Sequence, residues 1–312
     1  MNTLSRADLQ RLLGVNLPDE RTHVLITDRT EGDLRIRHFR CGRAQIPAVS
    51  VAPVNTKLDA PALLYCHAHG NAYGIGLSEA LEGRAALQDP PLAKVIARSG
   101  WTVFCADMPG FGARKVQGSE SALAKAAHWH GETLLGQMVN DQLIALDVLV
   151  EIARPSLVAT LGISMGGTLA YLVAALREDI AAAVHLCVFA DMAPLIANGA
   201  HDLHGPYLTI PGLLKKHDMS TIAALIAPRH QLVATGVEDP LTPADAYRPA
   251  IKTLLRAYKG HPDRLTVIRE KAVGHRETPE MRKAVLSFLA RLVDRVAPVA
   301  IGRYSRQGDV VG

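Results

Sequence analysis

The feature that most constrains the fold of this chain is a Gly-x-Ser-x-Gly turn between a short apolar segment and a helical one. Residues 157–163 predict a buried strand, and residues 165–176 predict a helix. Ser164 would occupy the sharp turn between them, and glycine stands two residues to either side because the chain approaches itself closely there. Such a turn raises the serine hydroxyl above the sheet edge and directs the N-terminus of the helix at it, where the Met165 N–H would stabilise an oxyanion. We therefore predict that Ser164 is a nucleophile.

The composition indicates a globular protein and argues against several other classes. Hydrophobic residues make up 48% of the 312 residues and charged residues 21%. The net charge of +4 comes from scattered Lys and Arg, so we expect no nucleic-acid partner. We find no signal-peptide pattern and no apolar stretch long enough to span a bilayer, so we expect a cytoplasmic protein without a membrane partner. The four cysteines stand singly in predicted strands and are expected to be buried, reduced thiols: Cys41, Cys66, Cys105 and Cys187.

Strands and helices alternate along most of the chain, which predicts a doubly wound, mostly parallel α/β sheet. We expect residues 1–312 to form one domain, in which residues 1–56 supply a helix and three antiparallel strands at the sheet edge. Residues 298–312 are expected to form a loose tail. The predicted strands are 22–28, 34–41, 45–53, 62–66, 101–106, 157–163, 182–190, 231–235 and 265–269. The predicted helices are 4–14, 80–99 with a break at Asp89-Pro-Pro91, 119–152, 165–176, 192–198, 219–226, 244–258 and 279–296.

Residues 192–228 interrupt this alternation. They combine two short helical stretches with irregular, Gly- and Pro-containing segments between two predicted strands. We interpret them as an insertion over the carboxyl ends of the strands, where it would form a lid or pocket wall. A plain surface excursion is the alternative.

A base and an acid follow Ser164 at the ends of later predicted strands. A serine needs an adjacent base to be nucleophilic, and the base needs a carboxylate that fixes its tautomer. His275 follows the strand at 265–269, and Asp239 follows the strand at 231–235. Because the carboxyl ends of parallel strands meet at one edge of a sheet, the three side chains can converge. We predict a Ser164–His275–Asp239 triad, with Asp191 as the main alternative acid and Glu238 and Asp245 as further ones.

The chain resembles the dienelactone hydrolase-related branch of the α/β hydrolase superfamily, including acetyl xylan esterase-like proteins. The resemblance covers about residues 60–295, and its motifs are His69-Gly70, Asp107-Met-Pro-Gly-Phe-Gly112, Gly162-Ile-Ser-Met-Gly-Gly167, Ala227-Pro-Arg229, Glu238-Asp-Pro240 and Gly274-His275. It implies the same triad, with oxyanion donors at Met165 and near Asn71. Dienelactone hydrolases use a cysteine nucleophile, whereas this chain has Ser164, which favours the hydrolysis of carboxylic esters.

The segment His67-Ala-His69-Gly70 follows a predicted strand, and in α/β hydrolases a His-Gly there opens the loop that completes the oxyanion hole. We expect the second donor to be the N–H of Asn71 or Ala72. His69, together with Tyr207 and His204 of the insertion, is expected to line the substrate pocket. The competing interpretation of His67 and His69 is a metal-ligand pair, but no further ligands cluster nearby in the sequence, so we expect no metal.

We therefore expect a serine esterase that acts on small or short-acyl esters through an acyl-enzyme and needs no cofactor. A peptidase, an acyltransferase and a non-catalytic binding module of the same fold are the alternatives. The low aromatic content of 4% disfavours a sugar polymer as substrate. Asp107 and Arg114, in the loop after the strand at 101–106, are expected to fix that loop rather than to catalyse. The oligomeric state is left open.

Overall fold

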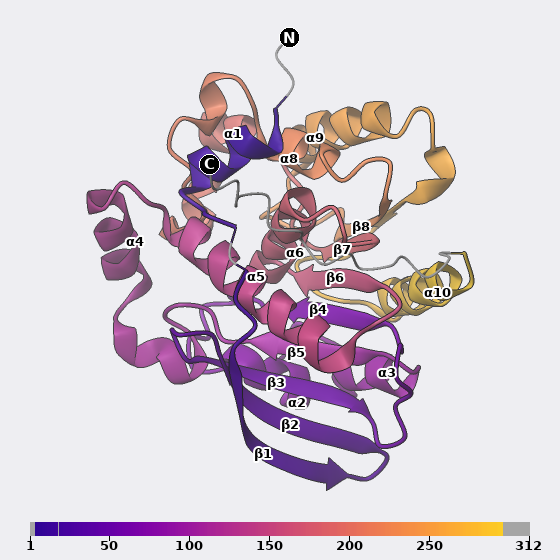
Figure 1. Ribbon diagram of the computed structural model, residues 1–312. Coiled ribbons are helices and arrows are strands. Elements are labelled where there is room, and N and C mark those ends of the chain that lie inside the picture. Colours follow the sequence, from indigo (N-terminus) through magenta and orange to yellow (C-terminus); the bar gives the residue numbers. More distant parts are fainter. Residues whose placement is uncertain (1–3, 18, 296–312) are drawn as a thin grey trace, which may run out of the picture.

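The computed structural model describes residues 4–17 and 19–295, which contain one nine-stranded sheet (Figure 1). The strands lie in the order β1-β2-β3-β5-β4-β6-β7-β8-β9; β4 to β9 run parallel, and β1 to β3 form an antiparallel edge beside β5. The predicted α/β class and the antiparallel N-terminal strands are thereby confirmed. The strands are His23–Glu31 (β1), Leu34–Cys41 (β2), Ile46–Pro53 (β3), Ala62–Cys66 (β4), Thr102–Ala106 (β5), Val158–Ile163 (β6), Ala182–Leu186 (β7), His230–Gly236 (β8) and Leu265–Glu270 (β9).

The strand order reverses at β4, because β5 lies on one side of it and β6 on the other. In open α/β sheets the ligand crevice lies at such a reversal, outside the carboxyl ends of the strands. β4 ends at Cys66, directly before the His67–Gly70 segment, and β6 ends at Ile163, directly before Ser164. Two predicted site segments therefore begin at this reversal.

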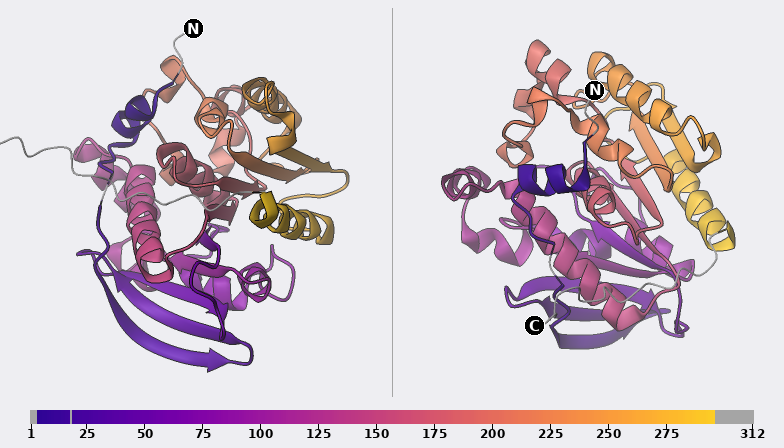
Figure 2. Two further views of the ribbon diagram at one scale, coloured as in Figure 1. Left: turned by 45° about the vertical axis from the view of Figure 1, so that its right-hand side comes forward. Right: turned by 45° about the horizontal axis from the view of Figure 1, so that its top comes forward.

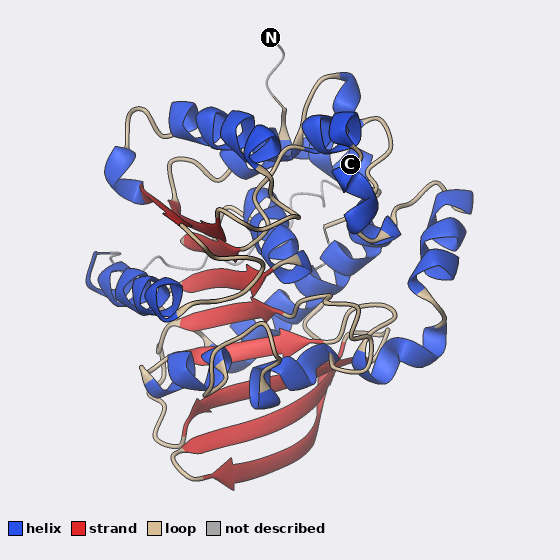
Figure 3. Ribbon diagram, turned by 180° about the vertical axis from the view of Figure 1, so that it is seen from behind, coloured by secondary structure: helices blue, strands red, loops and turns tan. Residues whose placement is uncertain are grey.

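Helices cover both faces of the parallel part of the sheet, as the views in Figure 2 and Figure 3 show. Apolar side chains of α1, α5, α6, α8 and α9 form the core on one face, and those of α2, α3 and α10 form it on the other. This arrangement is the doubly wound one. The α-helices are Arg6–Leu13 (α1), Glu79–Glu82 (α2), Leu92–Arg98 (α3), Glu120–Trp129 (α4), Leu134–Ala153 (α5), Met165–Leu176 (α6), Met192–Asn198 (α7), Met219–Ala224 (α8), Ala244–Ala257 (α9) and Pro279–Arg295 (α10).

One helix predicted as continuous is divided, and the predicted helix at 80–99 is interrupted before Leu92, in agreement with the break expected at Asp89-Pro-Pro91. The segment 119–152 forms α4 and α5, because Thr133 caps a new helix by accepting a hydrogen bond from the Gly136 N–H at 2.8 Å. The segment 80–99 forms α2 and α3, and Pro91 stands at the N-cap of α3. In the segment 119–152 the cap at Thr133 outweighs the apolar periodicity across the break.

The strand predicted at 182–190 ends at Leu186. The Cys187 N–H still donates to the Ala234 carbonyl of β8 at 2.8 Å, but its positive φ of 53° is incompatible with an extended strand, so the strand ends before it. Asp191, which we expected to end this strand, instead stands at the N-cap position of α7.

Residues 192–228 form α7, α8 and three short 3₁₀ helices between β7 and β8. The 3₁₀ helices are Ala200–Leu203 (η3), Pro206–Leu208 (η4) and Leu213–Lys215 (η5); three others occur at Gly76–Ser78 (η1), Gly112–Gln117 (η2) and Pro262–Arg264 (η6). Among the described residues, no helix combines the length and apolar character needed to cross a membrane. The predicted tail at 298–312 lies outside the described residues.

Candidate active site

Ser164 occupies a strained turn between β6 and α6. Its φ of 56° and ψ of −127° fall in a region that residues other than glycine rarely adopt. A Cβ added at Gly162 would lie 2.1 Å from the Gly166 carbonyl carbon, and one added at Gly166 would lie 1.9 Å from the Cys66 carbonyl oxygen. Side chains are therefore sterically excluded at both positions. Met165, the first residue of α6, has an N–H with no acceptor within its own helix.

Asp239 and His275 form a hydrogen-bonded pair. His275 Nδ1 lies 2.8 Å from Asp239 Oδ2, and Asp239 Oδ1 accepts the Leu241 N–H at 2.9 Å. The Asp239 side chain is wholly buried, whereas that of His275 is 24% exposed. A buried carboxylate held in this way fixes the imidazole and leaves Nε2 to act as a base.

Asp191, the alternative acid, has different partners. Its carboxylate accepts hydrogen bonds from the Ser220 N–H at 2.9 Å and from the Ser220 hydroxyl at 3.1 Å. Burial and the nearby charge of Asp218 raise its pKa to about 6. The structure thus pairs His275 with Asp239.

Ser164, Asp239 and His275 follow β6, β8 and β9, whose carboxyl ends lie at one edge of the sheet. Within the described part of the chain, no hydrogen bond joins the Ser164 hydroxyl to His275. Such bonds are often long in ligand-free enzymes and tighten in the complex with substrate.

The loop after β4 has an unusual backbone. Gly70 and Asn71 both have a positive φ of 53°. The Asn71 N–H donates to His69 Nδ1 at 3.0 Å, and the Ala72 N–H donates to the His69 carbonyl at 3.1 Å. Of the two expected oxyanion donors, Ala72 is therefore engaged in the turn of the loop itself, and Asn71 is bonded to a side chain.

Glu120, the first residue of α4, holds this loop and was not among the predicted site residues. Its carboxylate is buried and accepts hydrogen bonds from His69 Nε2 at 2.6 Å and from the Tyr73 hydroxyl at 2.8 Å. Its other oxygen accepts the Tyr207 N–H at 2.9 Å. Burial raises the pKa of Glu120, but the hydrogen bonds from His69, Tyr207 and Tyr73 more than offset this, so the pKa lies below its ordinary value.

A second buried carboxylate supports the other side of the loop. Glu79 accepts the Tyr65 hydroxyl at 2.8 Å and the Ala68 N–H at 3.0 Å, and forms an ion pair with Arg84. The Arg84 guanidinium in turn donates to the Ala68 carbonyl at 3.0 Å and lies where a Cβ at Gly70 would have to be. Both faces of the loop thus contact buried, charged groups.

His67 has a structural role. It is fully buried, its Nδ1 bonds to the Ala68 carbonyl at 3.1 Å, and its Nε2 accepts the Met108 N–H at 3.2 Å. Burial lowers its pKa to about 3, so the ring is neutral. Among the described residues, no group of three or more His, Cys, Asp or Glu could hold a metal ion.

Asp107 and Arg114 fix the loop after β5, as expected. Asp107 accepts the Leu77 and Ala113 N–H groups at 2.7 and 2.9 Å. Arg114 donates to the Asp107 carbonyl at 3.1 Å and to the carboxylate of Asp141.

The insertion at 192–228 encloses a cavity of about 430 Å³ whose wall is mostly apolar. His204 is part of this wall, its Nε2 is buried without a hydrogen-bond partner, and His275 and Asp239 are among the charges that act on its ring. Burial lowers the pKa of His204. The remaining wall residues are Met192, Ile196, His201, Asp202, Gly205, Pro206, Leu208, Thr209, Ile210, Leu213, Leu214 and Met219.

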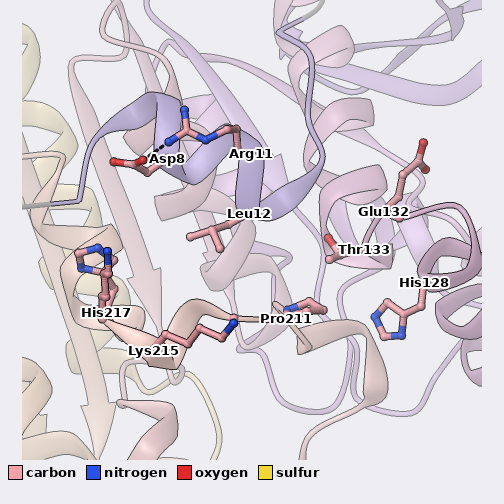
Figure 4. Close-up of a pocket in the computed structure, with 12 residues that line it drawn as sticks. Asp8, Arg11, Leu12, His128, Glu132, Thr133, Pro211, Lys215 and His217 are labelled. Carbon is pink, nitrogen blue, oxygen red and sulfur yellow. Dashed lines mark hydrogen bonds and ion pairs between the residues drawn. The ribbon is translucent and has the colours of Figure 1, made fainter.

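The other two residues expected in a pocket, His69 and Tyr207, are both buried, and their rings stack with centroids 5.4 Å apart. They do not belong to the wall of this cavity. A separate cleft of about 550 Å³ lies between α1, the α4–α5 turn and η5, with Arg11, Lys215 and His128 on its wall (Figure 4). None of the predicted site residues lines that cleft.

All four cysteines are buried and unpaired, as expected. Burial raises the pKa of Cys187 to about 12, and its thiol donates to the Arg276 carbonyl at 3.4 Å. A thiol in such surroundings stays protonated and is a poor nucleophile.

Comparisons with known proteins agree with this architecture. Residues 61–206 match the family described as "alpha/beta hydrolase fold". YtaP of Bacillus subtilis (strain 168), which is named as a hydrolase, is 36% identical over 300 residues, covering 93% of this chain and 99% of that protein. This chain therefore belongs to the α/β hydrolase family.

Structures of esterases share the fold at low sequence identity. A protein from Bacteroides fragilis named as an acetyl xylan esterase matches with a TM-score of 0.71 and 14% identity, over 92% of this chain and 86% of its own. The glucuronoyl esterase from Solibacter usitatus matches with a TM-score of 0.67 and 12% identity, over 92% of this chain and 91% of its own. These structures show the shared fold. The predicted membership of the α/β hydrolase superfamily is confirmed by the family match and the 36% identical relative, and the family supports a hydrolytic enzyme.

Proposed function

We propose that this protein hydrolyses carboxylic esters with Ser164 as nucleophile. The observation that carries the proposal is the hydrogen-bonded Asp239–His275 pair with its buried carboxylate, whose two residues follow strands of the same parallel sheet as the strained turn at Ser164. This combination is the one that serine hydrolysis requires: a hydroxyl on an elbow and an imidazole oriented by a carboxylate.

In the proposed mechanism, His275 takes the Ser164 proton while the serine oxygen attacks the ester carbonyl. The N–H groups of Met165 and Asn71 stabilise the tetrahedral oxyanion. His275 then protonates the leaving alcohol oxygen as the bond to the carbonyl carbon breaks, which leaves an acyl group on Ser164. The same imidazole activates a water molecule that releases the acid and restores the serine.

The cavity of the insertion supports a small ester with an apolar chain as substrate. Its 430 Å³ lies within the usual range of ligand pockets, about 300–1,000 Å³. Side chains such as Ile196, Leu208 and Ile210 line it, and His204 in its wall lies near enough to Asp239 and His275 for their charges to act on its pKa. We propose that the chain of the ester enters this cavity, with short acyl groups preferred.

The test is hydrolysis of p-nitrophenyl esters from acetate to octanoate by the wild type, Ser164→Ala and Ser121→Ala. Ser121 is exposed on α4 and is a matched control for the loss of a hydroxyl. We expect activity on short chains that only Ser164→Ala abolishes. Undiminished activity of Ser164→Ala would refute the nucleophile, and a folded wild type without activity on the whole series would favour amide hydrolysis, acyl transfer or ligand binding.

A further inference from the structure

Glu120, His69 and Asn71 form a directional chain of hydrogen bonds. A backbone N–H can only donate, so the bond between the Asn71 N–H and His69 Nδ1, at 3.0 Å, requires Nδ1 to be the acceptor. The ring proton of the neutral imidazole then resides on Nε2, which donates to Glu120 at 2.6 Å. The carboxylate of Glu120 thus fixes the tautomer of His69, and this tautomer provides the acceptor for the Asn71 N–H.

The surroundings hold the ring in this orientation. The His69 ring lies 5.2 Å from the rings of Tyr73 and Phe111 and is stacked on Tyr207. Its side chain is about one-tenth exposed, and that of Glu120 is 5% exposed. The other carboxylate oxygen of Glu120 accepts the Tyr207 N–H, so the same residue joins the loop after β4 to η4 of the insertion.

We propose that Glu120 is a positioning residue that acts through His69 on the Asn71 N–H; this rests on the proposed function, in which that N–H is an oxyanion donor. In the resting enzyme the N–H bonds to a neutral nitrogen. A hydrogen bond to an oxyanion is roughly twice as strong as one to a neutral acceptor. The Asn71 N–H therefore exchanges His69 Nδ1 for the substrate oxygen only as negative charge develops on that oxygen. The exchange therefore favours the transition state over the bound ester.

Glu120→Gln tests this inference, because an amide can accept hydrogen bonds on one side only. We expect the amide oxygen to lie at the Tyr207 N–H, a fixed donor, so the NH₂ group faces His69 Nε2 and the Tyr73 hydroxyl, which can rotate to accept. His69 must then accept at Nε2 and carry its proton on Nδ1. Two donors, the Nδ1–H and the Asn71 N–H, would then face each other. Loss of an oxyanion donor costs about 10²- to 10³-fold in kcat, and we expect a displaced donor to cost about tenfold or more, with KM changed less than about twofold.

Two further variants make the test specific. Glu132→Gln has the same loss of charge at an exposed site and should retain wild-type kcat. In a His69→Asn background, the side-chain oxygen of the asparagine can still accept the Asn71 N–H. Unlike imidazole, the amide group has no second tautomer. Glu120→Gln should therefore change kcat less than about twofold in that background.

An equal loss of kcat in both backgrounds, or a loss that appears in KM instead, would overturn the inference. A measurement on the wild type is independent of whether the variants fold: ¹⁵N NMR of the histidine ring should show His69 protonated at Nε2, and a proton on Nδ1 at neutral pH would also overturn it. A wild type without ester hydrolysis would refute the proposed function together with the inference. An active wild type whose kcat is unaffected by Glu120→Gln would refute the inference alone.

Discussion

Replacement of Asp239 by asparagine tests the proposed triad most directly, because the structure fixes the orientation of the new side chain. The Leu241 N–H donates to Asp239 Oδ1 at 2.9 Å, and this bond requires the amide oxygen of an asparagine to remain at that position. The NH₂ group must then face His275 Nδ1, which becomes an acceptor. The imidazole proton moves to Nε2, so His275 can no longer accept the proton of Ser164.

The expected loss is large and confined to the chemical steps. The corresponding change in the triad of a serine protease lowers kcat about 10⁴-fold, and we expect a similar factor here. Asparagine has the shape of aspartate, and the site is wholly buried, so we expect little change in KM or in the folded structure.

The assay is steady-state hydrolysis of p-nitrophenyl acetate by the wild type, Asp239→Asn and Asp191→Asn, with circular dichroism to verify folding. Asp191→Asn is the matched control, because it makes the same isosteric change at the alternative acid, whose carboxylate bonds to Ser220. We expect its kcat to stay within about threefold of the wild type. A folded Asp239→Asn that retained more than a tenth of wild-type kcat, or a greater loss in Asp191→Asn, would refute the reasoning.

Three further predictions concern the elbow, the pH dependence of stability and the pocket. Gly166→Ala should destabilise the protein by about 3 kcal/mol or more, because the added Cβ would overlap the Cys66 carbonyl. Gly260→Ala is the control, because its Cβ would meet nothing within 4 Å, and urea denaturation of the two variants should show a loss of stability only in Gly166→Ala. Because the folded-state pKa of Asp191 is raised to about 6, the folded protein binds its proton more tightly than the unfolded chain. This group should therefore lower the free energy of unfolding by up to roughly 3 kcal/mol as pH rises from 4 to 7, and denaturation curves of Asp191→Asn should lack this contribution; an identical pH dependence in the variant would refute it. Ile196→Trp should reduce kcat/KM for octanoate at least about tenfold more than for acetate, and an equal effect on both esters would place the chain outside this cavity.

The parts of the site that the sequence predicted are those that a local pattern specifies. The glycines around Ser164 follow from a steric requirement of the turn, and the structure shows the close contacts that impose it. Asp239 and His275 were found because polar residues directly after buried strands lie at the same sheet edge. Strand positions were predicted well for a similar reason, since a buried strand is a continuous apolar run.

The parts that the sequence did not predict depend on contacts between distant segments. Glu120 lies 51 residues from His69 and 87 from Tyr207 along the chain, and a glutamate in the first turn of a helix is usually exposed. The division of the predicted helix at 119–152 depends on the cap formed by Thr133, whose hydroxyl also donates to the Leu13 carbonyl of α1. The contacts of Glu120 and the Thr133–Leu13 bond have no signature in the neighbouring residues, whereas the cap itself is a local signal that the apolar periodicity of the segment concealed.

Two loops that carry proposed site residues, those of Asn71 and His275, are held by buried carboxylates outside the triad. Glu79 and Glu120 hold the loop of Asn71, and Glu277, two residues after His275, accepts the Gln88 N–H at 2.9 Å and pairs with Arg282. Removing one partner of a buried ion pair commonly costs about 3–5 kcal/mol, because the other charge is left without compensation. Loss of such a carboxylate would therefore reduce stability and displace a site loop at once. The residues that determine the geometry of this site thus include glutamates that touch neither Ser164 nor the ester.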